Sequence, residues 1–145
     1  MTADQIKNAI VTYFGRKLYA VAAEIGCDAW GKMRADVMAI NTRGEVIIVE
    51  VKSSYADFRS DKKWWNYADY SNKLYFAVSA ELHAKIHDLI PTGIGIFIVD
   101  EAGHARVVQS AKRKNLDRDL VLAQSIRMNF RHSEYQRYKR KSHAK

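Results

Sequence analysis

The chain has 145 residues but only one cysteine, Cys27, and one proline, Pro91. A lone cysteine excludes a disulfide framework within the chain and fits a reducing compartment. No catalytic-cysteine motif surrounds Cys27, so we expect a half-buried structural residue. The sequence also shows no linker, low-complexity stretch or internal repeat. One domain with a single core is therefore expected.

Long apolar runs are missing as well. No stretch approaches the roughly 20 apolar residues that cross a bilayer as a helix. The first residues, Met1–Asp4, lack the basic and apolar regions of a signal peptide. We therefore expect a cytoplasmic protein with no membrane partner, and no small-molecule cofactor is expected either.

Acidic residues are few in the last quarter of the chain. Residues 106–145 contain twelve Lys/Arg and three Asp/Glu, whereas residues 1–105 contain twelve Lys/Arg and thirteen Asp/Glu. A basic patch attracts phosphate backbones, and the interleaved Tyr135 and Tyr138 are able to stack on bases. Nucleic-acid binding is favoured here over the alternative of a solubilising tail. The basic residues expected to bind are Arg131, Arg137, Lys139 and Arg140.

Charges within two apolar segments are the main chemical signal. Residues 34–40 contain Asp36, and residues 45–52 contain Glu50 and Lys52. Charges in apolar surroundings are costly unless something compensates them. A divalent cation held by both carboxylates, with the lysine beside it, would compensate them, and this is the arrangement of a metal-dependent nuclease. Mg²⁺ or Mn²⁺ is expected because hard cations prefer oxygen ligands.

The spacing of these charges predicts that they meet. Side chains alternate along a strand, so Glu50 and Lys52 share a face. If residues 42–44 form a three-residue hairpin loop, which a final glycine favours, counting outward places Asp36 opposite Glu50. Directly opposed residues have Cβ atoms about 5 Å apart. A one-residue slip in register would send Asp36 to the other face.

Hydrophobic periodicity predicts the remaining elements. Helices are expected over residues 4–19, 55–70, 80–89 and 115–131, and further strands over residues 19–25, 74–79, 94–99 and 106–108. This order predicts an α/β (α+β) fold with a central mixed β-sheet flanked by helices. Residues 1–131 are expected to form a single nuclease-like domain, and residues 132–145 a basic, frayed C-terminal tail. Of Trp64 and Trp65, one is expected to point inward and the other outward.

The pattern of Asp36 followed by Glu50-Val51-Lys52 resembles the PD-(D/E)xK nuclease superfamily, which has the restriction-endonuclease-like core. The flanking segments make the resemblance more specific, to the MmcB-type DNA repair family within that superfamily. The segments that carry it are Arg34–Asp36, Val49–Ser54, Asp57–Arg59, Asp61–Trp64, Tyr67–Tyr70 and Leu74–Val78. The similarity covers roughly residues 19–131. The chain departs from the family pattern at Trp64-Trp65-Asn66 and in its basic, Tyr-rich tail.

The resemblance implies a bacterial or phage-encoded, nucleoid-associated protein that acts on DNA in repair or recombination. Many members of the superfamily work as dimers, so a homodimer is among the expectations. The resemblance also implies Asp36 and Glu50 as metal ligands, with the Val51 backbone carbonyl as a third, and Lys52 beside the attacking water.

Further residues are implied by the same resemblance. Many relatives have an additional upstream acid at the metal, for which Glu24 is the candidate, with an ordinary exposed glutamate as the alternative. Lys63 and Tyr67, expected on or near the helix after the catalytic strand, match the family pattern and are candidates for nucleic-acid binding.

The predicted function is a metal-dependent deoxyribonuclease that hydrolyses phosphodiester bonds, with endonuclease favoured over exonuclease. Two alternatives stay open, a catalytically silent DNA-binding module on the same fold and an RNA-processing nuclease. The corresponding alternative for the site is an ion-pair cluster of Asp36, Glu50 and Lys52 without a metal, which is less favoured because burying such charges is expensive.

Overall fold

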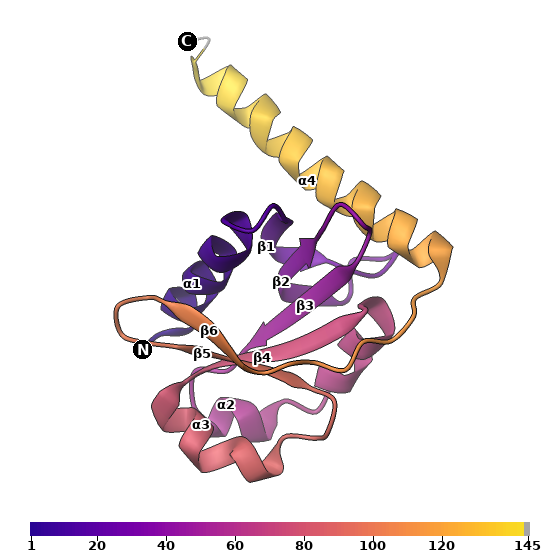
Figure 1. The fold of residues 1–145 in the computed structure, drawn as a ribbon. Coiled ribbons are helices and arrows are strands. Elements are labelled where there is room, and N and C mark those ends of the chain that lie inside the picture. Colours follow the sequence, from indigo (N-terminus) through magenta and orange to yellow (C-terminus); the bar gives the residue numbers. More distant parts are fainter. Residues whose placement is uncertain (144–145) are drawn as a thin grey trace.

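A six-stranded mixed sheet organises the fold (Figure 1). The computed structural model describes residues 1–143, apart from the side chains of Tyr135 and His143. The strands are β1 (Ala20–Gly26), β2 (Arg34–Ile40), β3 (Val46–Val51), β4 (Lys73–Ser79), β5 (Gly95–Val99) and β6 (Ala105–Gln109).

The strands lie in the sheet in the order in which they follow along the chain. Strands β1, β2 and β3 are antiparallel neighbours, β3, β4 and β5 run parallel, and β6 returns antiparallel to β5. The two parallel pairs are those joined by helical connections, because a parallel pair requires a crossover. The result is an α+β fold with a mixed sheet flanked by helices, consistent with a restriction-endonuclease-like core, as the sequence predicts.

The β2–β3 hairpin has the predicted register. Its pairs run from Ile40 opposite Val46 to Val37 opposite Val49. The amide of Asn41 donates to the carbonyl of Glu45 at 3.2 Å, which closes the loop over residues 42–44. The next position outward from the last pair therefore brings residues 36 and 50 face to face.

The helix α1 (Ala3–Gly15) covers one face of the sheet (Figure 1). It begins after Thr2, whose side chain accepts a hydrogen bond from the first turn. Its apolar side packs Phe14 into a cluster with Val49 of β3. The helix ends short of the predicted residue 19, and Leu18 adopts a left-handed backbone with φ of 61°.

Shorter helices and one long helix cover the other face. They are α2 (Tyr55–Ser60), the 3-10 helix η1 (Trp64–Tyr70), α3 (Ala80–Ile86), the 3-10 turn η2 (His87–Leu89) and α4 (Arg118–His143). Among the described residues, no helix combines the length and the apolar character needed to cross a membrane.

The single helix predicted over residues 55–70 is wrong. Asp61 leaves the helical region with ψ of 111°, and its side chain accepts a hydrogen bond from the Lys63 amide at 2.8 Å. The local hydrogen bond competes with helix propagation, so the chain restarts as the 3-10 helix η1. Within η1, Trp64 packs against the core and Trp65 is 51% exposed, which confirms the predicted inward and outward pair.

The N-terminal half of α4 is anchored to the sheet by buried polar contacts. The fully buried Gln124 donates to the carbonyls of Cys27 at 3.0 Å and of Tyr70 at 3.1 Å. Arg127 donates to the same Cys27 carbonyl at 3.1 Å, and Met128 packs into the core. These contacts place the helix across the end of β1 and against η1.

The C-terminal half of α4 extends beyond the body of the molecule (Figure 1). The helix continues to His143, so the frayed segment expected from residue 132 onward is helical to that residue, and residues 144–145 lie outside the described part. From His132 to Ser142, every side chain that the structure describes is exposed. Beyond His132, whose ring lies 3.2 Å from the Val21 carbonyl, the backbone hydrogen bonds of a continuing helix therefore order this half.

Candidate active site

Asp36 and Glu50 lie side by side at the edge of the β2–β3 hairpin. Glu50 is only 4% exposed, and Asp36 is half-buried. One carboxylate oxygen of Asp36, Oδ2, accepts a hydrogen bond from the Val51 amide at 2.8 Å. This bond ties the start of β2 to the end of β3 and holds the two acids together, as the hairpin register predicts.

The electrostatics of Glu50 are unusual for a carboxyl group. Burial, and then the hydrogen bond with Asp36 and the nearby negative charge, raise the pKa of Glu50 to about 10. Without a cation, Glu50 therefore holds a proton at neutral pH. Glu50 Oε1 is buried and has no hydrogen-bond partner among the residues that the structure describes. A buried acceptor of this kind is normally satisfied.

These groups fit a divalent cation. A cation would replace the Glu50 proton and take up the unpartnered Oε1. Among the side chains that the structure describes, no group of three or more His, Cys, Asp or Glu converges on a common point. The protein ligands would therefore be two carboxylates and main-chain oxygen, with water completing the shell, as Mg²⁺ commonly accepts. A residue's N–H and C=O project to the same side of a strand, so the Val51 carbonyl points toward Asp36.

Glu24 does not join this site. Its backbone has a left-handed φ of 50°, and its carboxylate pairs with Lys7 of α1 at 3.2 Å. Helix α1 covers the face of the sheet opposite to that of Asp36 and Glu50. The turned backbone and the Lys7 pair hold the Glu24 carboxylate on the α1 side, so the structure does not bring this predicted ligand together with Asp36 and Glu50.

Lys52 lies beside the two acids but is paired with Asp61. Its side chain is buried, and its ammonium forms an ion pair with Asp61, which also accepts the Lys63 amide. Although burial opposes it, the Lys52 contact holds the pKa of Asp61 below its ordinary value. Asp61 stands in the family-like segment 61–64, but its spacing in the sequence does not indicate this role. The break in the helix brings it to Lys52, and periodicity alone does not indicate that break.

Of the two residues predicted to bind nucleic acid near the strand end, Tyr67 is committed to the fold. Its hydroxyl donates to the Arg34 carbonyl at 2.9 Å, and its ring packs against the core. Burial, followed by the charges of nearby acids and Cys27, raises the pKa of Tyr67. Lys63 lies two residues after Asp61, and its side chain is exposed. It can therefore contact a ligand.

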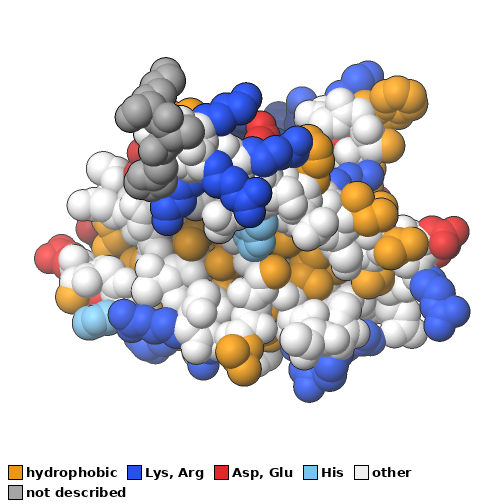
Figure 2. Space-filling model, turned by 90° about the horizontal axis from the view of Figure 1, so that it is seen from above, with side chains coloured by type: hydrophobic (Ala, Val, Ile, Leu, Met, Phe, Trp, Pro, Cys, Tyr) orange, Lys and Arg blue, Asp and Glu red, His pale blue; other side chains and the backbone are white. Residues whose placement is uncertain are grey.

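The basic residues of α4 fall into two groups. Arg131 is half-buried and donates to the carbonyls of Ala23 at 2.7 Å and Glu24 at 2.8 Å, so it anchors α4 to β1. Tyr138 is 72% exposed, and the cations around it are exposed as well. These cations are Arg137, Lys139, Arg140 and Lys141. Figure 2 shows Lys and Arg side chains gathered on the face toward which the end of α4 points.

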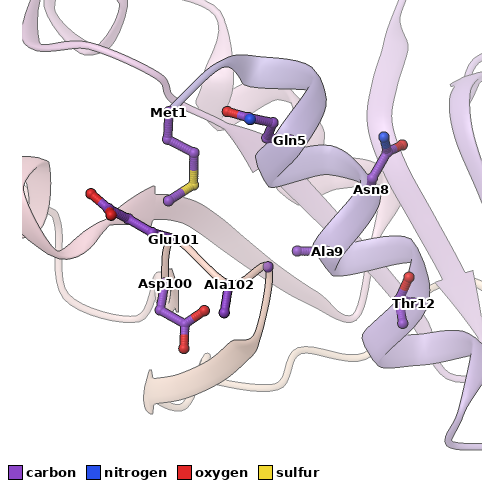
Figure 3. Close-up of a pocket in the computed structure, with 9 residues that line it drawn as sticks. Met1, Gln5, Asn8, Ala9, Thr12, Asp100, Glu101 and Ala102 are labelled. Atoms are coloured by element: carbon purple, nitrogen blue, oxygen red, sulfur yellow. The ribbon is translucent and has the colours of Figure 1, made fainter.

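A separate hollow of about 350 Å³ lies between α1 and the turn after β5 (Figure 3). Its lining includes Gln5, Asn8, Asp100 and Glu101. It contains no basic side chain and is formed on the α1 side of the sheet, away from Glu50. It therefore has no part in the candidate site.

Comparisons with known proteins agree with this architecture. The chain resembles a protein of unknown function from Silicibacter pomeroyi, with a TM-score of 0.87 and 23% sequence identity over 100% of this chain and 95% of that one. At this identity the likeness shows the fold alone. No curated protein matches the sequence. The family model described as "DNA repair protein MmcB-like" matches residues 1–142. With nearly the whole length matched, the chain belongs to the MmcB-like family of DNA repair proteins.

Proposed function

We propose that this protein is a metal-dependent nuclease that hydrolyses phosphodiester bonds of DNA during repair. The observation that supports the proposal most is the Asp36–Glu50 pair, in which the buried Glu50 has a raised pKa and an unpartnered oxygen. A carboxyl pair that is costly without a cation and satisfied with one is characteristic of a functional site. Membership of the DNA repair family supports DNA as the substrate.

Each residue of the site has a separate task in this proposal. Asp36 and Glu50 would hold Mg²⁺ or Mn²⁺, with the Val51 carbonyl as a further ligand. When bound, the cation would neutralise phosphate charge and lower the pKa of a bound water. Lys52 presents a positive charge beside the acids, where charge develops on the phosphate oxygens. Asp61 fixes the position of the Lys52 ammonium, so that little reorganisation is needed during reaction.

DNA would be held by exposed cations next to the site and on the C-terminal half of α4. Lys63 follows α2 close to the Lys52–Asp61 pair, and the C-terminal half of α4 presents Arg137, Lys139 and Arg140 around Tyr138. These side chains are exposed, so they can reach phosphates without unfolding any part of the core. The hydrogen bonds of Arg131 and Tyr67 to main-chain carbonyls make both residues part of the scaffold.

The alternative that a specific contact favours is a silent DNA-binding module. Lys52 is neutralised by Asp61, and an ion pair of this kind can serve stability alone. The two alternatives differ in one measurable property. A nuclease binds a divalent cation at Asp36 and Glu50, whereas a silent module does not need to.

The first experiment measures Mn²⁺ binding by calorimetry and Mn²⁺-dependent thermal stabilisation. The wild type is compared with Asp36→Asn and Glu50→Gln, and with Glu81→Gln as a control, since Glu81 is an exposed acid on α3. We expect a single site in the wild type and the control, and loss of binding in both site variants. Equal Mn²⁺ binding by all four proteins would contradict the proposed ligands.

The second experiment measures cleavage of linear, nicked, flapped and four-way-junction DNA with Mg²⁺, Mn²⁺ or EDTA. Both site variants are expected to lower the rate at least about 100-fold, the usual effect of losing a group that stabilises the transition state. DNA binding in EDTA should change little. Binding without cleavage across the whole panel would favour the silent module, and cleavage of RNA alone would favour the RNA-processing alternative.

A further inference from the structure

An exposed tryptophan stands on the loop that leads into the candidate site. Trp30 is 85% exposed, while Trp65 is 51% exposed and Trp64 packs against the core. Fully solvated tryptophans are uncommon because the ring is the largest apolar side chain. The exposure of Trp30 therefore calls for an explanation that folding does not provide.

The loop that presents Trp30 is firmly held at its base. Gly26, the last residue of β1, pairs with Arg34, the first residue of β2, so residues 27–33 form the connection. The Cys27 amide donates to the Met33 carbonyl at 2.9 Å, and the Met33 amide donates to Asp28 Oδ1 at 3.0 Å. Trp30 lies midway along this loop.

Helix α4 clamps the same loop from outside. Gln124 and Arg127 both donate to the Cys27 carbonyl, and Cys27 itself is fully buried. The loop therefore has a rigid base and an aromatic tip that projects into solvent. A preorganised aromatic side chain loses little conformational entropy when a ligand stacks on it.

The loop also leads directly to the metal-binding acids. Trp30 precedes Asp36 by six residues, a span of at most about 20 Å along the chain. Arg34 shares a face of β2 with Asp36, because alternate residues of a strand point the same way. Lys32 and Arg34 are both exposed, and neither has a carboxylate partner within the described residues. An aromatic tip is thus followed by two available cations and then by the carboxylate.

We infer that Trp30, Lys32 and Arg34 form a binding track for single-stranded DNA, in which an unpaired base stacks on the Trp30 ring while the two cations contact the adjoining phosphates. An aromatic ring with nearby cations is the recognised chemistry of single-strand binding, since every base offers a stacking face. In a duplex the bases are already stacked on each other and cannot use the ring. The inference rests on the proposed function, because it gives the nuclease a preference for DNA with an unpaired segment next to the cut.

The experiment measures binding in EDTA, so that cleavage plays no part. The probes are a single-stranded oligothymidylate and a blunt duplex of equal length, and the readouts are fluorescence anisotropy of the DNA and intrinsic tryptophan fluorescence. The variants are Trp30→Ala and Trp30→Phe. The control is Leu18→Ala, because Leu18 is 88% exposed at the opposite end of β1.

Trp30→Ala is expected to weaken binding of the single strand about ten-fold, within the range measured for loss of one stacking partner. Binding of the duplex should stay unchanged. Trp30→Phe should keep most of the affinity for the single strand, and the control should behave as the wild type. The single strand should quench tryptophan fluorescence in the wild type and much less in Trp30→Phe, whose remaining tryptophans lie in η1.

Several results would overturn the inference. Equal losses for single strand and duplex would make Trp30 a general contact, and no loss for either would remove it from the interface. A change in molecular mass of Trp30→Ala in sedimentation, with DNA binding intact, would make Trp30 a protein contact.

If the wild type cuts no DNA but shows the Trp30-dependent preference, the nuclease proposal fails and the binding track stands. If it cuts DNA without that preference, the reverse holds.

Discussion

At the scale of single residues, the largest free-energy cost of burying ionisable groups falls on Glu50 and Lys52. Both residues are 4% exposed, and each depends on a neighbour that is distant in sequence, Asp36 for the acid and Asp61 for the amine. Buried ionisable groups are tolerated when they are paired or bind a metal. Two residue-scale predictions follow from the different ways in which these groups are compensated.

The first concerns the pH dependence of stability in EDTA. The pKa of Glu50 is about 10 in the folded protein and 4.5 as its ordinary value, so the folded state binds the extra proton between these pH values. Stability should therefore fall as pH rises through this window, by at most about 1.4 kcal/mol per unit for this group. Glu50→Gln removes the titrating carboxyl group and should therefore flatten that slope. In a separate measurement without EDTA, the same variant should lose stabilisation by Mn²⁺. Chemical unfolding at pH 5, 7 and 9 measures the effect, and identical slopes in both proteins would contradict it.

The second concerns the Lys52–Asp61 pair. Asp61→Leu leaves the buried Lys52 ammonium without its partner, which is expected to cost about 3 kcal/mol of unfolding free energy. The double variant Lys52→Met with Asp61→Leu should recover most of this loss, because no buried charge is left unpaired. Urea unfolding of the two single variants and the double variant gives the coupling energy. Additive losses would show that the pair contributes nothing beyond its separate residues.

At the scale of elements, α4 performs two different tasks along its length. Gln124, Arg127 and Arg131 are bonded to main-chain carbonyls of β1 and of the loop after it, whereas the half beyond Arg131 is exposed. The first half is a clamp on the loop that carries Trp30, and the second half is a charged arm. Basic residues on one helix therefore cannot be assigned to DNA binding from their charge alone.

The arm can be tested without shortening the chain. Replacing Arg137, Lys139, Arg140 and Lys141 together by Gln keeps good helix formers at all four positions. We expect weaker DNA binding and a salt dependence whose logarithmic slope falls by roughly 0.9 for each lost phosphate contact.

Binding isotherms between about 50 and 200 mM salt measure the slope. Replacement of exposed cations elsewhere, Arg16→Gln with Lys112→Gln, serves as the control. An unchanged slope in the fourfold variant would reduce the arm to an aid to solubility.

At the scale of the whole molecule, the two faces of the sheet have different roles. Helix α1 closes one face with a purely apolar cluster, while the other face combines apolar packing with Glu50, Lys52, Asn72 and Gln124. Asn72 accepts the Val46 amide at 2.7 Å and donates to the Lys114 carbonyl at 2.9 Å, so it ties the segment before α4 to the start of β3. The candidate site, the loop of Trp30 and helix α4 are therefore parts of one folded unit on this face of the sheet.

Cys27 offers a probe of that unit. It is fully buried, and burial raises its pKa to about 12, with smaller contributions from the charges of Asp28 and Glu50. At pH 8 the native thiol should therefore react with iodoacetamide at least about 100-fold more slowly than the thiol of an unfolded chain, whose pKa is about 8.5. Mass spectrometry across a urea series should show alkylation that follows unfolding. Rapid alkylation in native buffer would contradict the clamped loop.

Much of the fold follows from local rules that the sequence expresses directly. Alternation of side chains and the glycine at the end of a three-residue loop are sufficient to place Asp36, Glu50 and Lys52 on one face, and the hairpin has that register. The ends of the helices follow less directly from the sequence. The helix breaks at Asp61 because its carboxylate pairs with Lys52 and accepts a hydrogen bond from the Lys63 amide. Neither contact is compatible with a helix that continues through Asp61. Helix α4 continues to His143 through backbone hydrogen bonds, and a polar sequence without apolar periodicity does not predict this continuation.

The sequence by itself determined the charged hairpin, the order of strands and helices, and the basic end of the chain, because each is expressed in short-range periodicity or composition. The tertiary structure alone decided which partner each polar group takes. It paired Lys52 with Asp61, turned Glu24 toward Lys7, bound Tyr67 to Arg34 and fastened Arg131 to β1. These choices depend on distances between segments far apart in the chain, and packing of the whole core sets those distances.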